Sequence, residues 1–153
     1  MLKYYLVLLL MILSVNAYAI PSDTVSVTVW GTGEDARFEP AVVQVQPGDV
    51  IRFEVKEGLH TVTAYHPENR RPQRIPEDAA AFNSGMLQTG QTWFLKLNTA
   101  GMYDYFCLPH ERMGHLGRIF VGPIENISGY PVGRIPASAL IMLDKATQDL
   151  INP

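Results

Sequence analysis

Short runs of alternating residues, separated by turn-forming residues, set the strongest limit on the fold of this chain. The run Thr24–Trp30 alternates β-branched apolar residues with small polar residues, which is the period-two pattern of a half-buried strand. Six further strand-like runs follow at 41–46, 50–55, 60–65, 92–97, 102–106 and 117–121. Seven short strands predict an all-β domain, either a sandwich or a barrel.

Two connections between these runs have distinctive compositions. The sequence Pro47-Gly48-Asp49 suits a tight turn, so the runs on either side of it resemble the two strands of a hairpin. The longest connection, 66–90, is rich in Pro, Arg and Glu, and within it the segment 76–82 begins with a proline followed by acidic residues. Because helices often begin in this way, we expect a helical turn there.

The pattern changes after Gly122, and the residues near the C-terminus predict a helix. Over 136–151, the apolar side chains recur close to the helical period, namely at Leu140, Ile141, Leu143 and Leu150. The polar face lacks the Lys and Arg enrichment of a helix that lies on a membrane. We therefore expect the helix to pack its apolar stripe on the β-domain.

The first 19 residues have the features of a secretory leader. A single cation, Lys3, precedes the apolar run 4–15, and Ala17-Tyr18-Ala19 matches the small-x-small pattern of a cleavage site. The apolar run is about a dozen residues long, shorter than the ~20 that span a membrane. The sequence predicts cleavage after Ala19 and a periplasmic or extracellular protein with no stable membrane insertion.

The remaining composition is that of one small domain with no nucleic-acid-binding character. About 134 residues remain after the leader, which is the usual size of one domain. The whole chain has 12 basic and 15 acidic residues, a net charge of −3. Three arginines, Arg70, Arg71 and Arg74, fall close together, and we interpret them as a solvated polar loop in preference to a partner surface.

The only cysteine, Cys107, has a histidine, His110, three residues after it. In an oxidising compartment, a single thiol without an internal disulfide partner is buried, reactive or bound to a metal. A thiolate and an imidazole at this spacing can reach one ion from a single tight loop between two strands. This combination favours copper, with zinc and a small buried hydrophobe as the alternatives.

A copper ion that cycles between two oxidation states commonly takes two imidazoles, one thiolate and a weaker axial ligand. The second imidazole must come from a distant strand, so that the sheet holds the site rigidly. His60 fits, because the chain returns to the same end of the domain after the run 50–55. His66, the first residue of the long connection, is interpreted as an ordinary loop residue outside the site.

Five segments together resemble the cupredoxins, and most of all the plastocyanin, pseudoazurin and halocyanin group: 38–40 (FEP), 45–49 (VQPGD), 58–62 (GLHTV), 105–110 (YFCLPH) and 117–121 (GRIFV). The resemblance extends over about 25–122. It implies a Greek-key β-sandwich of seven or eight strands, one type 1 copper ion near one end and one-electron transfer between redox partner proteins. The copper-binding domain would then occupy 20–123, and 124–153 would form a C-terminal extension.

The resemblance leaves two residues for the fourth ligand. The plastocyanin-like pattern places the axial methionine five residues after the histidine, where this chain has His115, and the amicyanin-like pattern places it three residues after, at Met113. The strand-like run that follows His115 favours that residue. A nitrogen in place of a weak thioether would stabilise Cu(II) and lower the reduction potential. A backbone carbonyl or an empty axial position is the remaining alternative.

Three functions are compatible with such a site. The first is a monomeric electron carrier that is not an enzyme, the second a copper-binding or copper-delivery protein with no electron-transfer role, and the third an enzyme with an open copper position. A cysteine enclosed between two strands indicates a closed, slowly exchanging site, which favours the carrier. We also expect Thr61 to connect the two loops that supply the ligands.

Overall fold

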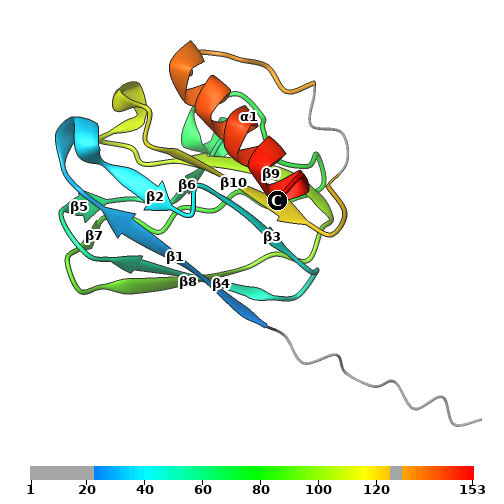
Figure 1. Cartoon of the computed structure of the whole chain (residues 1–153), viewed down its shortest axis with the longest axis horizontal. Helices are drawn as coiled ribbons and strands as arrows, with labels where there is room; N and C mark the ends of the chain where they lie inside the picture. The colour runs from blue at the N-terminus through cyan, green and yellow to red at the C-terminus, as the bar shows by residue number, and fades with distance from the viewer. Residues whose placement is uncertain (1–22, 125–128) are drawn as a thin grey trace, which may run out of the picture.

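The computed structural model describes residues 23–124 and 129–153, and it shows two four-stranded sheets with one helix beside them (Figure 1). The expected leader and its cleavage site lie outside the described residues. Over the described ranges, no helix has the length and apolar character needed to cross a membrane.

The first sheet has the strand order β2-β1-β4-β8. β1 pairs in antiparallel fashion with β2 and in parallel fashion with β4, and β4 pairs in antiparallel fashion with β8. The bounds of these strands are β1 Thr24–Trp30, β2 Arg37–Glu39, β4 Val50–Val55 and β8 Thr92–Lys96.

The second sheet has the strand order β3-β10-β9-β6, in which β10 is parallel to β3 and antiparallel to β9. Two short strands, β5 and β7, pair separately. The bounds are β3 Val42–Val45, β5 Leu59–His60, β6 Thr63–Ala64, β7 Leu87–Gln88, β9 Gly101–Phe106 and β10 Leu116–Val121. Three 3-10 turns and a helix complete the fold: η1 Gly33–Asp35, η2 Pro67–Asn69, η3 Glu111–Met113 and α1 Ala137–Ile151.

The main core lies between the two sheets, as the period-two pattern predicts. Val27 and Val29 of β1, Phe53 of β4, and Tyr105 and Ile119 of the opposite sheet belong to one cluster of buried side chains. The predicted all-β sandwich is therefore confirmed. In the described part of the chain, eight strands form its two sheets, within the expected seven or eight.

The predicted hairpin at 47–49 is wrong, because β3 and β4 belong to different sheets. The turn does form, and the backbone N–H of Asp49 donates to the carbonyl of Gln46 at 3.0 Å. The turn takes the chain from the second sheet to the first. There the N–H of Gly48 donates to the carbonyl of Leu97, directly after β8, at 2.8 Å. Each strand finds a parallel partner instead, β10 for β3 and β1 for β4.

The predicted strand over 60–65 is divided into β5 and β6. The backbone N–H groups between them leave the strand ladder, because that of Thr61 donates to Cys107 Sγ and that of Val62 donates to Ser84 Oγ at 2.9 Å. The segment 76–82 forms a single turn, in which the N–H of Ala79 donates to the carbonyl of Pro76 at 3.0 Å. No helix continues from this turn in the described structure.

The predicted C-terminal helix is confirmed as α1, and it lies over β3 and β10 on the outer face of the second sheet (Figure 1). Its buried face differs from the predicted stripe: Ala139, Leu143 and Thr147 are buried, whereas Ile141 is 67% exposed. Ala139 and Leu143 belong to one cluster of buried side chains with Val42, Leu116 and Phe120 of the second sheet. Contact with β3 and β10 therefore sets the buried face.

The prediction of a solvated arginine loop is wrong for Arg71 and Arg74. Arg74 is 4% exposed and pairs with Asp104 of β9, Nη2 to Oδ2 at 2.5 Å. Arg118 of β10 pairs with the same carboxylate, Nε to Oδ1 at 2.7 Å. Arg71 pairs with Glu111, Nη2 to Oε2 at 2.6 Å. The buried carboxylates of Asp104 and Glu111 thus hold Arg74 inside the fold and Arg71 in a half-buried position.

Candidate metal centre

All four predicted ligands meet at one end of the sandwich. His60 ends β5, Cys107 directly follows β9, His110 lies in the loop, and His115 directly precedes β10. One candidate ligand atom from each of these residues lies within 4.8 Å of the others. The ladder between β9 and β10 continues to the site, because the N–H of Cys107 donates to the carbonyl of His115 at 3.1 Å.

The thiol of Cys107 lies between two imidazoles. Its Sγ is 3.6 Å from His60 Nδ1 and 3.4 Å from His110 Nδ1. The ring of His115 lies beside both, with centroid separations of 5.1 Å to His60 and 5.8 Å to His110. One sulfur and three imidazoles therefore face a common centre, and this donor set fits a single soft or borderline metal ion.

Thr61 connects the two loops that supply these residues, as predicted. Its backbone N–H donates to Cys107 Sγ at 3.4 Å, and its Oγ1 accepts from the N–H of Leu108 at 2.8 Å. The hydroxyl of Thr63 donates to the same Oγ1 at 2.9 Å. Two hydrogen bonds thus tie the residue after His60 to Cys107 and to Leu108.

Two residues that orient His60, Glu57 and Gly58, were not predicted from the sequence. The Nε2 of His60 lies 2.7 Å from the carbonyl oxygen of Glu57, which is a hydrogen bond if Nε2 carries the proton. That tautomer leaves the Nδ1 lone pair toward Cys107. Gly58, at φ +95°, makes this possible, because a Cβ there would lie 2.7 Å from Nε2. The only signal in the sequence was a glycine two residues before a candidate ligand.

His115 is buried without a polar partner. It is 1% exposed, and its ring lies 4.0 Å, centroid to centroid, from that of Phe38. Among the described residues, neither of its ring nitrogens has a hydrogen-bond partner. A buried nitrogen left in this way costs about 1–3 kcal/mol, so the environment is that of an imidazole arranged for a metal ion.

Met113 and His66, the other two residues considered as ligands, lie outside the buried cluster. Met113, in η3, is 51% exposed. His66 lies outside the cluster, where its Nδ1 accepts from the N–H of Glu68 at 3.2 Å and caps η2. The burial of His115 and the exposure of Met113 favour His115 as the fourth ligand, and this assignment stays a prediction.

The surroundings of the site favour uncharged side chains in the metal-free protein. Burial lowers the pKa of His110, and the charge of His60 lowers it further. Burial, followed by the charges of His60 and His110, lowers the pKa of His115 to about 3. Burial raises the pKa of the Cys107 thiol, against the opposing hydrogen bond from Thr61. The imidazoles of His110 and His115 are therefore ready to bind a metal, and the thiol must release its proton when it binds.

A thiolate and imidazoles at the end of a two-sheet β-sandwich define a copper-binding protein of the cupredoxin class. The model of the plastocyanin/azurin family of copper binding proteins matches residues 25–122. The chain belongs to this family, whose metal is copper.

Relatives and solved structures agree with this assignment. The chain is 32% identical over 108 residues to pseudoazurin of Paracoccus pantotrophus, covering 70% of this chain and 68% of that protein. It is 32% identical over 85 residues to chloroplastic plastocyanin of Tetradesmus obliquus, covering 55% of this chain and 57% of the relative. The crystal structure of pseudoazurin from Methylobacterium extorquens AM1 has the same fold, with a TM-score of 0.63, 23% identity and coverage of 84% and 99%.

Proposed function

We propose that this chain is an exported protein with one copper ion, which carries single electrons between redox partner proteins. His60, Cys107 and His110 would hold the metal, with His115 as the fourth ligand. The observation that supports this proposal best is the convergence of these four side chains within 4.8 Å. Bound copper would supply the Cu(II)/Cu(I) couple, and the chain turns over no substrate in this role.

The protein's contribution is to hold the ligands in one arrangement. His60 is oriented by Glu57, Cys107 by the amide of Thr61, and His115 by the strand that follows it. A site fixed by a sheet and by hydrogen bonds changes little when its charge changes, which favours fast electron exchange. A delivery protein would instead need ligands that separate easily.

The exposed residues beside the site suit a transient contact with a partner. His110 is the least buried of the four, so its ring is the point at which an electron would enter or leave. Four large apolar side chains are exposed on the segments that carry the site or pair with them: Leu59, Met86, Leu108 and Met113, each between 51% and 56% exposed. Such a surface desolvates easily on contact, which favours brief docking.

The proposal includes export and a division of the chain. Residues 1–19 would be removed as a secretory signal, and 20–123 would form the copper-binding domain. The extension 124–153 then supports this domain from outside, since α1 packs on the sheet that carries Cys107 and His115.

Absorption and EPR spectra of the copper-loaded protein test the first part of this proposal. We expect an intense band from charge transfer between the thiolate and Cu(II), which Cys107→Ser abolishes. Electron self-exchange should also be much faster than copper release to a chelator. Rapid release with slow exchange would support copper delivery, and the absence of the band in the folded wild-type protein would contradict the proposed site.

The fourth ligand is tested by the reduction potential. Replacing a nitrogen donor with a weaker thioether should favour Cu(I), so we expect His115→Met to raise the potential. Met113→Leu is the matched control, because Met113 is exposed and should leave the potential and the spectrum unchanged. A shift in Met113→Leu with none in His115→Met would assign the axial position to Met113.

A further inference from the structure

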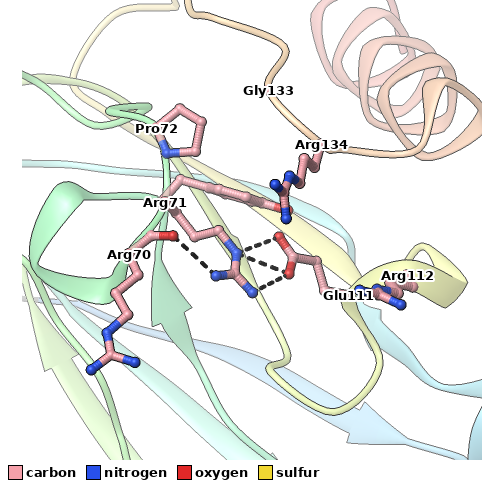
Figure 2. A pocket seen from close by; sticks show the side chains of 8 residues that line it. Arg70, Arg71, Pro72, Glu111, Arg112, Gly133 and Arg134 are labelled. Atoms are coloured by element: carbon pink, nitrogen blue, oxygen red, sulfur yellow. Dashed lines mark hydrogen bonds and ion pairs between the residues drawn. The ribbon is translucent and has the colours of Figure 1, made fainter.

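A second polar site lies beside the metal centre, in a cavity of about 520 Å³ (Figure 2). Three separate segments form its walls: the loop after β6, the turn η3 and the extension before α1. The lining residues are Tyr65, Arg70, Arg71, Pro72, Glu111, Arg112, Gly133 and Arg134. None of the four predicted copper ligands lines this cavity.

The lining carries a strong positive charge, with four guanidinium groups and one carboxylate. Arg71 uses the carboxylate of Glu111, and the dashed lines in Figure 2 mark this pair. Among the residues that the structure describes, Arg70, Arg112 and Arg134 form no ion pair. All three arginines are exposed, and together they give this face of the molecule a positive potential that attracts anions.

Tyr65 supplies a further donor to this cavity. The residue is fully buried, and its hydroxyl has no hydrogen-bond partner in the described structure. Burial and the nearby carboxylate of Glu111 raise the pKa of Tyr65, so the hydroxyl keeps its proton. The lining of the cavity therefore includes a buried, protonated hydroxyl beside the carboxylate of Glu111.

The cavity walls are held in place. The guanidinium of Arg71 is fixed by both oxygens of Glu111 and lies 4.9 Å from the ring centroid of Phe106. Gly133, at φ +59°, packs so closely on Pro72 that a Cβ would lie 2.5 Å from the proline ring. The extension is thus tightly packed against the arginine loop, which brings Arg134 to the cavity.

We propose that this cavity is a binding site for a small polyanion that carries phosphate-type groups. Arg70, Arg112 and Arg134 would supply the charge, and the hydroxyl of Tyr65 would donate a hydrogen bond. Guanidinium groups match the oxygens of such anions in pairs, which makes arginine suited to this role. The concave shape, made by segments distant in sequence and open to solvent on one side, favours a small ligand over a flat protein surface.

Titration calorimetry of the full mature, copper-loaded protein with pyrophosphate tests this site at physiological salt. We expect saturable one-to-one binding that is tighter than for chloride or sulfate. The charge-removing variants Arg112→Gln and Arg134→Gln should each weaken binding about tenfold, as loss of a charge-assisted hydrogen bond does. Tyr65→Phe should weaken it about threefold, because a neutral donor contributes less.

Arg52→Gln is the matched control, because it removes the same charge from β4, outside the cavity. It should leave pyrophosphate binding within twofold of the wild type, and circular dichroism should show that every variant is folded. An equal loss of pyrophosphate affinity in Arg52→Gln and Arg134→Gln would show that overall charge attracts the anion. The absence of saturable binding would show that the cavity does not bind pyrophosphate. Either result overturns the proposal, and neither bears on copper binding or electron transfer.

Discussion

Thr61 joins the two ligand loops with two different groups. Its amide reaches the sulfur of Cys107, and its hydroxyl accepts from the amide of Leu108. A side chain of the same shape without the hydroxyl would keep the first contact and lose the second. A substitution at Thr61 therefore measures what the second contact contributes to the stability of the metal centre.

We expect Thr61→Val to lower the free energy of unfolding by about 1–2 kcal/mol, because the half-buried amide of Leu108 loses its acceptor. The charge-transfer band should remain, since the amide of Thr61 still reaches the sulfur. Urea denaturation of the copper-free protein measures the loss. Thr92→Val, at a half-buried position on β8, is the control and should change stability much less.

His115 makes the copper-free protein sensitive to acid. The folded state keeps this ring neutral down to a pKa of about 3, whereas the unfolded chain takes up a proton below about 6.5. Because the unfolded state then binds more protons, stability is fully present above about 6.5 and decreases as the pH falls toward 3, by at most about 1.4 kcal/mol per pH unit.

Denaturation at several pH values between 7 and 4 checks this expectation. His115→Gln has no ring to protonate, so its stability should fall less steeply with decreasing pH than that of the wild type. Other groups titrate equally in both proteins, and the difference between the two slopes therefore reports on His115. Identical slopes would contradict the buried, neutral state of this residue.

At the scale of elements, the turn before β5 decides whether His60 faces the site. Gly58 has a positive φ, and any Cβ on it would meet both the carbonyl of Gly31 and the ring of His60 at 2.7 Å. Gly90, in the turn before β8, has a similar φ of +86° but no heavy atom within 4 Å of such a Cβ. A substitution at Gly90 therefore introduces backbone strain alone, whereas a substitution at Gly58 also introduces steric contact with His60.

We expect Gly58→Ala to weaken copper binding about tenfold or more, since it displaces a ligand from the carbonyl that orients it. Gly90→Ala should lower the free energy of unfolding by about 1–2 kcal/mol through backbone strain alone, and it should leave copper affinity unchanged. Competition with a chelator of known affinity measures the copper affinity of both variants. Equal copper affinity in the two variants would show that the turn tolerates a side chain.

At the scale of the whole molecule, a buried carboxylate connects the second sheet to the C-terminal extension. Asp104 receives both Arg74 and Arg118, and Arg118 continues to Asp144 and to the hydroxyl of Thr147 on α1. Arg74 also donates to backbone carbonyls of the extension at 130 and 131. The helix is thus attached by polar contacts as well as by apolar burial.

We expect Asp104→Asn to lower the free energy of unfolding by about 3–5 kcal/mol, because two buried guanidinium groups lose their shared counter-charge. Asp144→Asn removes a carboxylate that is 61% exposed, and should cost at most about 1 kcal/mol. Urea denaturation of both copper-free variants gives the comparison. A cost for Asp144→Asn as large as that for Asp104→Asn would mean that the exposed end holds the network.

Much of the strand pattern could be predicted from the chain because it depends on short-range order, and the candidate ligands could be predicted because short segments resemble those of the cupredoxins. β1 and β4 match the predicted runs residue for residue, since alternation along a strand is written in consecutive positions. Cys107 and His110 are three residues apart, and family-like motifs pointed to His60 and His115. The whole cluster therefore appears in the sequence before any contact is known.

Other features depended on partners that local patterns do not specify. The residues around 47–49 favour a turn, but the pairing of β3 with β10 and of β4 with β1 is a matter of distant strands. Arg74 looks like a surface residue until Asp104, 30 positions later, is placed beside it. The buried face of α1 likewise follows from its contact with Val42, Leu116 and Phe120, which are far away in the sequence.

By itself, the sequence determined the all-β class, the copper-type ligand set and the C-terminal helix. The class and the helix follow from periodicity, and the candidate ligands follow from the chemistry of Cys107 and His110 together with the resemblance of five segments to the cupredoxins. Only the tertiary structure decided which strands pair, which way His60 faces, and that an arginine-lined cavity lies beside the metal centre. The physical reason is that burial and long-range contacts give a side chain its neighbours, and the neighbours decide its charge, orientation and use.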